Sequence, residues 1–156
     1  MDDTPGSPFG PRTAPGRVAG LTALLSLLCT FVLAAPVQAG TIIAASCPCG
    51  YAVKGLPLFG GNSNFKTVCN FPALCKATGR LTLVNALDPT APPKDCPSGE
   101  VVSYESPIMR KADGGEPIAT WRVPGKDMVL SLFAGRYLCP RCLKYSLRFQ
   151  VVGYWD

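Results

Sequence analysis

Two short cysteine clusters lie ninety positions apart, and they constrain the fold more than any other feature of this chain. Residues 46–51 read SCPCGY and residues 137–142 read YLCPRC. Each cluster has a proline directly after its first cysteine. If both clusters contribute to one metal site, that site joins the two ends of the folded domain. The alternatives are a redox dithiol and the ends of separate disulfides.

The first 39 residues are typical of a secretory signal peptide. Positive charge precedes an uncharged apolar run at residues 18–35, and VQAG follows, so small residues stand where signal peptidase requires them. We therefore expect cleavage after Ala39, which gives a secreted or periplasmic protein with no membrane contact. The alternative is a retained anchor, because eighteen apolar residues just reach the length that spans a bilayer.

Residues 40–156 are long enough for a single small domain. This part carries thirteen Lys and Arg against eight Asp and Glu, and its cations are scattered singly. Such a surface is mildly basic and lacks the clustered cations of a nucleic-acid footprint, so we expect no binding to RNA or DNA. No interdomain linker is evident. The sequence predicts one β-rich, cysteine-containing domain.

Short runs of alternating or β-branched residues recur along this domain, each bounded by turn residues. The pattern predicts strands joined by hairpins and loops. The expected strands cover residues 51–53, 65–68, 80–84, 100–104, 118–123, 128–133 and 145–152. One helical turn is expected at 72–77, and the proline-rich residues 88–97 are expected to form an exposed loop. The predicted fold is therefore a small, mostly antiparallel β domain.

The number of cysteines does not decide what they do. Of eight cysteines, seven lie after the signal region: Cys47, Cys49, Cys69, Cys75, Cys96, Cys139 and Cys142. An odd number leaves one thiol over in a framework of disulfides alone, which exported chains usually avoid. A four-cysteine metal site with one disulfide also leaves one thiol. Local sequence is more informative than parity.

The residues around the two clusters favour tight turns that hold a metal. Structural zinc is bound tetrahedrally by four thiolates, commonly as two pairs on such turns. CPCGY at 47–51 has proline after its first cysteine and glycine after its second, and a predicted strand follows. CPRC at 139–142 has the proline and the usual two-residue gap, but Leu143 replaces the glycine.

On these residues the chain resembles the zinc ribbons, the rubredoxin-like family of cysteine knuckles. The resemblance implies one structural zinc with four ligands: Cys47, Cys49, Cys139 and Cys142. The sequence departs from the family pattern in two ways. The first knuckle is one residue short, and eighty-nine residues separate Cys49 from Cys139, where about fifteen to twenty are usual. The insert is expected to loop out and return as its own β unit.

A second, degenerate ribbon-like pattern lies inside this insert. LCKATGRLTLV at 74–84 and DCPSGEVVSY at 95–104 have Thr78 and Ser98 near the positions of second cysteines. Two sulfurs cannot hold zinc in a closed structural site, but in an oxidising compartment they can close as a disulfide. This likeness implies a Cys75–Cys96 bridge. A Cys69–Cys75 bridge is the rival pairing.

The residue types argue against an enzyme. The chain contains no histidine, the usual general base, and no paired-carboxylate motif. Zinc held by four cysteines also lacks the open position that a catalytic metal needs. Thiol–disulfide catalysis by CPRC would need a helix N-terminus to lower the thiol pKa, but a β-type sequence follows it.

The chain end GYWD, at residues 153–156, is the candidate contact for another protein. Tyr154 and Trp155 are large side chains near a terminus, where they serve either as an anchor for a partner or as core. The sequence thus predicts an exported, non-catalytic binding or assembly module with structural zinc. The alternatives are a disulfide-stapled secreted domain without metal and a thiol–disulfide or metal-handling protein.

Overall fold

The computed structural model describes residues 39–93, 95–113, 115–123 and 125–156, and these residues are mostly β. The predicted signal peptide lies outside the described residues except for Ala39. No helix among the described residues is long and apolar enough to cross a membrane. The mostly antiparallel β fold expected from the sequence is confirmed.

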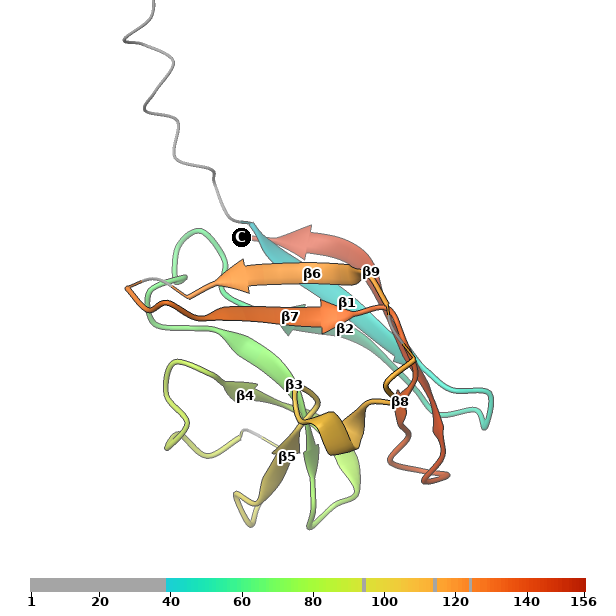
Figure 1. Cartoon of the computed structure of the whole chain (residues 1–156). Helices are drawn as coiled ribbons and strands as arrows, with labels where there is room; N and C mark the ends of the chain where they lie inside the picture. The colour runs from blue at the N-terminus through green and yellow to red at the C-terminus, as the bar shows by residue number, and fades with distance from the viewer. Residues whose placement is uncertain (1–38, 94, 114, 124) are drawn as a thin grey trace, which may run out of the picture. The chain divides into compact units, whose positions relative to one another are not determined.

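The strands and one short 3-10 turn follow one another along the chain (Figure 1). Their bounds are β1 Gly40–Ser46, β2 Ala52–Leu58, β3 Asn70–Cys75, β4 Arg80–Asn85, β5 Val101–Ser103, η1 Pro107–Met109, β6 Pro117–Arg122, β7 Val129–Phe133, β8 Tyr137–Leu138 and β9 Tyr145–Trp155. They form three antiparallel sheets, with strand orders β2-β1-β9-β8, β4-β3-β5 and β6-β7.

The pairing of β1 with β9 joins the two ends of the described domain. The register runs from Gly40 opposite Trp155 to Ser46 opposite Arg148. Because the strands are antiparallel, the end of β1 lies beside the beginning of β9. The β1–β2 turn and the β8–β9 turn therefore emerge at the same end of this four-stranded sheet, which we call the knuckle sheet.

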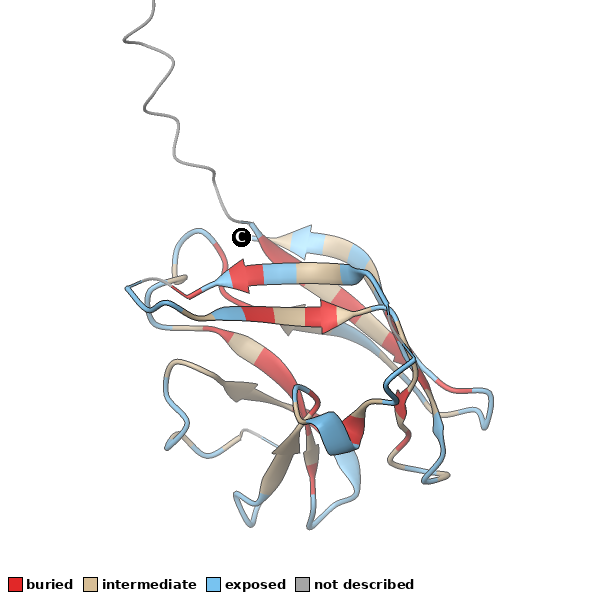
Figure 2. Ribbon diagram, viewed as in Figure 1, coloured by how far each residue is buried: buried red, intermediate tan, exposed pale blue. Residues whose placement is uncertain are grey.

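The residues of β1 and β9 explain why these strands form one inner and one outer face. Side chains on successive strand residues point to opposite sides of a sheet. In β1 the alternation places Ile43 and Ala45 in the core, and in β9 it places Leu147 and Phe149 there. Figure 2 shows buried residues recurring along the strands in this way.

Of the eighty-nine residues between Cys49 and Cys139, the first and last strands, β2 and β8, belong to the knuckle sheet. The part between them, residues 59–136, which we call the insert from here on, carries the other two sheets and shares one core with the knuckle sheet. Phe149 of β9 stacks edge-on against Tyr104 and Tyr137, with ring centroids 5.4 and 4.9 Å away. Trp121 of β6 stacks on Phe59 at 5.5 Å. The expectation that the segment between the knuckles forms its own β unit therefore holds only for the sheets of β3 to β7, because β2 and β8 pair within the knuckle sheet. The hydrophobic side chains of the insert pack together with those of β1, β8 and β9.

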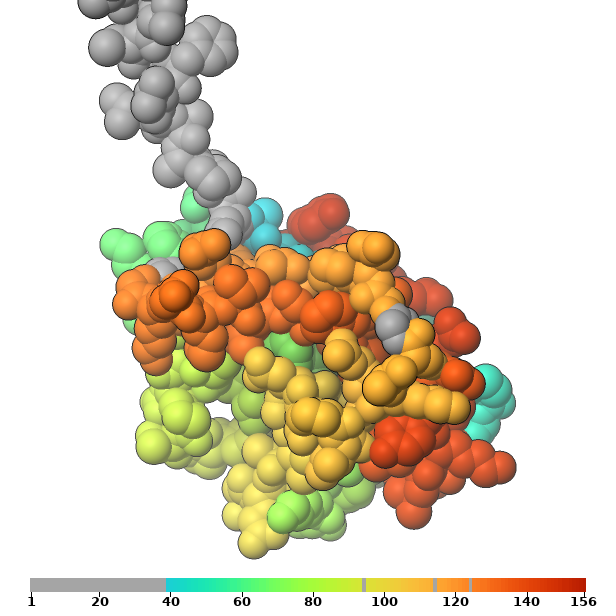
Figure 3. Space-filling model, in the orientation of Figure 1, coloured from blue at the N-terminus to red at the C-terminus, as the bar shows by residue number. Residues whose placement is uncertain are grey.

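Side chains of the insert also cover one face of the domain. In Figure 3 the segments coloured yellow to orange, around η1, β6 and β7, lie side by side on the face in view. One contact between them is a cation–π interaction, with the Arg110 guanidinium 4.2 Å from the centre of the Phe133 ring.

Two local predictions were wrong. Residues 65–68 form part of a turn rather than a strand, because Asn64 organises the backbone: its side chain accepts from the Gly61 N–H at 2.8 Å, and its carbonyl accepts from Thr67 and Val68. The helical turn expected at 72–77 is instead mostly β3, because that segment pairs with β4 on one side and β5 on the other. Long-range pairing outweighs local propensity there.

The aromatic cluster at Phe149 predicts a large loss of stability on truncation. Phe149→Ala should lower the free energy of unfolding by about 3–5 kcal/mol, because it leaves a cavity between Tyr104 and Tyr137. Gln150→Ala, at the neighbouring exposed position, should change it by less than about 0.5 kcal/mol. Urea unfolding followed by fluorescence measures both. Equal losses would contradict the packing described above.

Candidate metal centre

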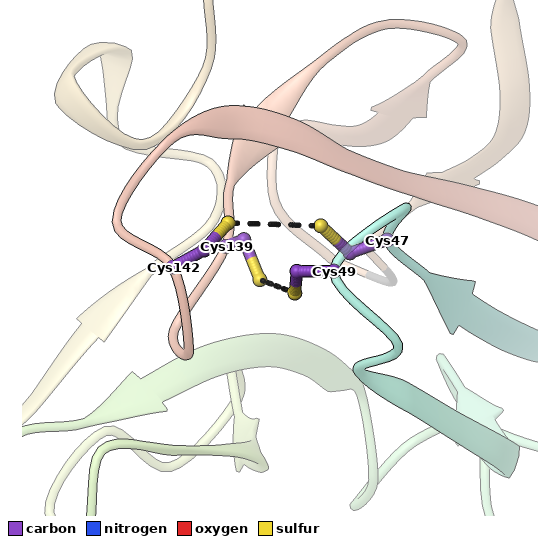
Figure 4. A group of neighbouring side chains, drawn as sticks. All are labelled: Cys47, Cys49, Cys139 and Cys142. Carbon is purple, nitrogen blue, oxygen red and sulfur yellow. Dashed lines mark hydrogen bonds between the residues drawn. The ribbon is translucent and has the colours of Figure 1, made fainter.

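Four cysteines from the two turns of the knuckle sheet come together at one point (Figure 4). Cys47 and Cys49 lie on the β1–β2 turn, which we call the first knuckle, residues 47–51. Cys139 and Cys142 lie on the β8–β9 turn, the second knuckle, residues 139–144. All four sulfurs lie within 4.8 Å of one another. The structure thus brings together the four residues that the sequence predicted as metal ligands.

The sulfurs contact one another in two pairs across the knuckles. Cys49 Sγ lies 3.7 Å from Cys139 Sγ, and Cys47 Sγ lies 3.8 Å from Cys142 Sγ. Disulfide sulfurs are separated by about 2 Å, so neither pair is covalently joined. In a regular tetrahedron with zinc–sulfur bonds of about 2.3 Å, the sulfurs are about 3.8 Å apart. The two contacts match that separation.

Both knuckles are built by the same backbone device, a left-handed residue directly after the second cysteine. Gly50 has φ 85° and its N–H donates to the Cys47 carbonyl at 3.0 Å. Leu143 has φ 55° and its N–H donates to the Cys139 carbonyl at 2.9 Å. The sequence pointed to glycine as the natural residue here, and the structure shows Leu143 adopting the same strained conformation. The fold accepts that strain to close the second knuckle.

Aromatic residues next to the knuckles attach them to the insert. The hydroxyl of Tyr51 accepts from the Leu81 N–H of β4 at 3.1 Å. The hydroxyl of Tyr145 donates to the Ile108 carbonyl of η1 at 2.8 Å. Each knuckle is therefore fixed on two sides, by its own strands and by one hydrogen bond to the insert.

Ser146 contacts the sulfurs of both knuckles, a role that was not predicted from the sequence. Its Oγ lies 3.1 Å from Cys47 Sγ and 3.6 Å from Cys142 Sγ. Hydroxyls commonly orient and stabilise metal-bound thiolates from outside the ligand set. No spacing rule marks such a residue. The available signal was a small polar side chain in β9, the strand that starts at the second knuckle.

Cys47, Cys139 and Cys142 differ in how readily their thiols ionise. The Ser146 hydroxyl, with the Lys144 backbone, lowers the pKa of Cys142 to about 6. Burial opposes ionisation of Cys47, but hydrogen bonds from Ser146 and Cys49 outweigh it, so that pKa is lowered too. Burial raises the pKa of Cys139 to about 12. A thiolate at this buried position is stable only with a cation beside it, and a divalent ion at the centre of the four sulfurs supplies one.

The remaining cysteines divide into a disulfide and a buried thiol. Cys75 and Cys96 form a disulfide with Cα atoms 5.5 Å apart, the pairing implied by the ribbon-like pattern. Cys69 is fully buried in the core and is not bonded to Cys75, and burial raises its pKa to about 11. The disulfide is compatible with folding in an oxidising compartment.

The predicted partner contacts at the chain end have different surroundings. Tyr154 is 73% exposed. Trp155 is half-buried, and its indole N–H donates to the Leu58 carbonyl at 3.2 Å. Asp156 accepts from the Asn62 N–H at 2.9 Å, so the last residues are attached to the insert. Tyr154 is thus available to a partner, and much of the Trp155 surface already packs within the domain.

Comparison with known proteins gives no relative for this chain. No protein-family model matches it, and neither a curated protein nor a solved structure does. The four-cysteine cluster is compatible with a zinc-ribbon-like site on its own geometry. The function therefore has to be inferred from the site itself.

The conformation of Leu143 generates a prediction. Its side chain is 70% exposed, so removing it loses little packing, whereas its left-handed backbone costs about 1–2 kcal/mol. Leu143→Gly should therefore raise the free energy of unfolding by about 0.5–1 kcal/mol, after the extra backbone entropy of glycine is subtracted. Leu143→Ala retains Cβ and should give no such gain. Thermal unfolding of the two variants checks this, and a gain for both would contradict the strain argument.

Proposed function

We propose that this chain is an exported, non-catalytic module that binds a partner protein and is held together by one structural zinc. The ligands are Cys47, Cys49, Cys139 and Cys142. The observation that carries the proposal is the convergence of their four sulfurs within 4.8 Å of one another, with two separations across the knuckles, 3.7 and 3.8 Å, that match a tetrahedral thiolate site. A tetrahedral set of four sulfurs selects zinc, or iron in rubredoxin-like sites.

The zinc would contribute folding free energy rather than chemistry. Four protein thiolates fill the tetrahedron, so no position is left for water or substrate. Binding would tie the β1–β2 turn to the β8–β9 turn, near the two ends of the described domain. Because the four sulfurs come together only in the fold, the free energy of metal binding becomes free energy of folding.

A binding role is supported by an exposed aromatic side chain near the chain end, that of Tyr154. Tyr154 is a large side chain that is mostly exposed next to a strand end fixed by Trp155 and Asp156. Tyrosine is enriched among residues that dominate binding energy, and a preorganised anchor loses little entropy on binding. The apolar run at residues 18–35 and the Cys75–Cys96 disulfide support export to an oxidising compartment.

The metal site is tested by elemental analysis of the chain purified without added metal. We expect about one zinc per chain, lost in Cys139→Ser and retained in Cys69→Ala, which removes a thiol outside the cluster. Removing the metal with a chelator should lower the unfolding temperature of the parent and leave that of Cys139→Ser unchanged. Iron found in place of zinc would support the four-cysteine site and overturn only the identity of its metal. Metal-free protein with these four cysteines in disulfides would contradict the proposal.

The binding role is tested by co-purification from the native host. We expect one companion protein to be captured in near-stoichiometric amount, with capture reduced about tenfold or more by Tyr154→Ala. Val129→Ala, which truncates another exposed side chain, is the matched control and should capture as the parent does. Equal capture by both variants would remove Tyr154 from the proposed interface, and no companion in any preparation would contradict the module role.

A further inference from the structure

The strands around the disulfide repeat the arrangement of the knuckle sheet. In the knuckle sheet, β1 lies between β2, which follows the first knuckle, and β9, which follows the second. In the insert, β3 lies between β4, which follows the turn after Cys75, and β5, which follows the turn after Cys96. All these pairs are antiparallel. The orders β2-β1-β9 and β4-β3-β5 are thus equivalent.

The first cysteine occupies the same place in both arrangements. Cys47 directly follows the last residue of β1, and Cys75 is the last residue of β3. The end of each middle strand lies beside the strand that follows the second turn: Ser46 is opposite Arg148, and Cys75 is opposite Val101. Two sequence-distant turns therefore meet at the end of each sheet.

One turn of the insert matches the first knuckle residue by residue. Residues 96–99 read CPSG and residues 47–50 read CPCG. Gly99 has φ 70° and donates its N–H to the Cys96 carbonyl at 3.0 Å, the same bond that Gly50 makes to Cys47 at 3.0 Å. Ser98 stands at the position of the second cysteine, and its Oγ lies 3.9 Å from Cys96 Sγ.

The other turn matches the second knuckle. Residues 75–79 read CKATG and residues 139–143 read CPRCL. Gly79 has φ 61° and donates its N–H to the Cys75 carbonyl at 2.9 Å, as Leu143 does to Cys139 at 2.9 Å. Thr78 stands at the position of the second cysteine. The two turns occur in the opposite order along the chain, but both have the knuckle conformation.

We propose that β3, β4 and β5, with the turns at Cys75 and Cys96, form a second ribbon with a latent four-ligand metal site at Cys75, Thr78, Cys96 and Ser98. The Cys75–Cys96 disulfide joins its two turns where metal coordination would join them in the knuckle sheet. Thr78 and Ser98 offer neutral hydroxyls in place of thiolates, so the site binds no soft metal ion as it stands. The two turns keep the backbone conformation of the knuckles, and two of the four thiols are missing.

The latent site contains none of the four cysteines of the proposed zinc site and does not depend on that site. A disulfide joins the turns at Cys75 and Cys96, whereas a metal ion would join the two knuckles. A reductant should break the Cys75–Cys96 disulfide without removing metal from the knuckles. A chelator should remove the metal and leave the disulfide intact. The domain would thus have two independent cross-links, the Cys75–Cys96 disulfide and the metal bound by the two knuckles.

The test restores the two missing thiols in the full chain. The double variant Thr78→Cys/Ser98→Cys is reduced with a phosphine, which supplies two electrons to the Cys75–Cys96 disulfide while water supplies two protons. Cobalt(II) is then titrated under reductant, and the four thiols release protons as they bind it. We expect one more cobalt per chain than in the parent, with the absorption bands of tetrahedral thiolate coordination.

Thr90→Cys/Ser106→Cys is the matched control, because it adds two thiols in other loops and should bind no more cobalt than the parent. A folded Thr78→Cys/Ser98→Cys variant with the parent's cobalt content would overturn the latent site. If that variant does not fold, Ser98→Cys alone is titrated: cobalt bound beyond the parent supports the site, and none overturns it. A parent that binds no metal would contradict the proposed zinc site, while a gain of one cobalt in the variant would still support the latent one.

Discussion

The antiparallel pairing of β1 with β9 is the constraint on which the rest of the structure depends. It places the end of β1 beside the beginning of β9, with Ser46 opposite Arg148, and so brings the two knuckles to one end of a sheet. Without this register the two pairs of cysteines, which lie about ninety residues apart along the chain, would not meet in space. The inner face created by the same pairing carries Ile43 and Phe149, on which the insert packs.

The insert is held to the knuckle sheet mainly by side-chain contacts, because its strands belong to other sheets. Tyr104 contacts Phe149 in β9, and its hydroxyl donates to the Leu138 carbonyl of β8 at 3.0 Å. Tyr51 and Tyr145 add one hydrogen bond each between the knuckles and the insert. Without these contacts the inner, apolar face of the knuckle sheet would be exposed to water. A small sheet needs such a face to be packed in order to be stable.

The sequence predicted the features that depend on local chemistry. CPCG and CPRC indicated tight turns, and CPSG indicated a related turn at Cys96, all of which the structure contains. Alternation indicated most of the strands, but it missed β1 and wrongly indicated a strand at 65–68. The sequence did not predict what depends on distant residues. β3 was assigned as a helical turn because its pairing with β4 and β5 cannot be seen in the local sequence. Ser146 was missed because only the fold brings its hydroxyl to Cys47.

The β1–β9 pairing has a consequence for the order in which the domain can form. Cys47 is synthesised about ninety residues before Cys139, and its strand β1 cannot pair with β9 until almost the entire chain is present. Closing a loop of this length costs roughly 4 kcal/mol of chain entropy, and contacts between distant residues slow folding. The insert, whose β3–β4 and β6–β7 hairpins are local, has no such delay. The cysteine cluster therefore cannot assemble before the second knuckle and β9 have been synthesised.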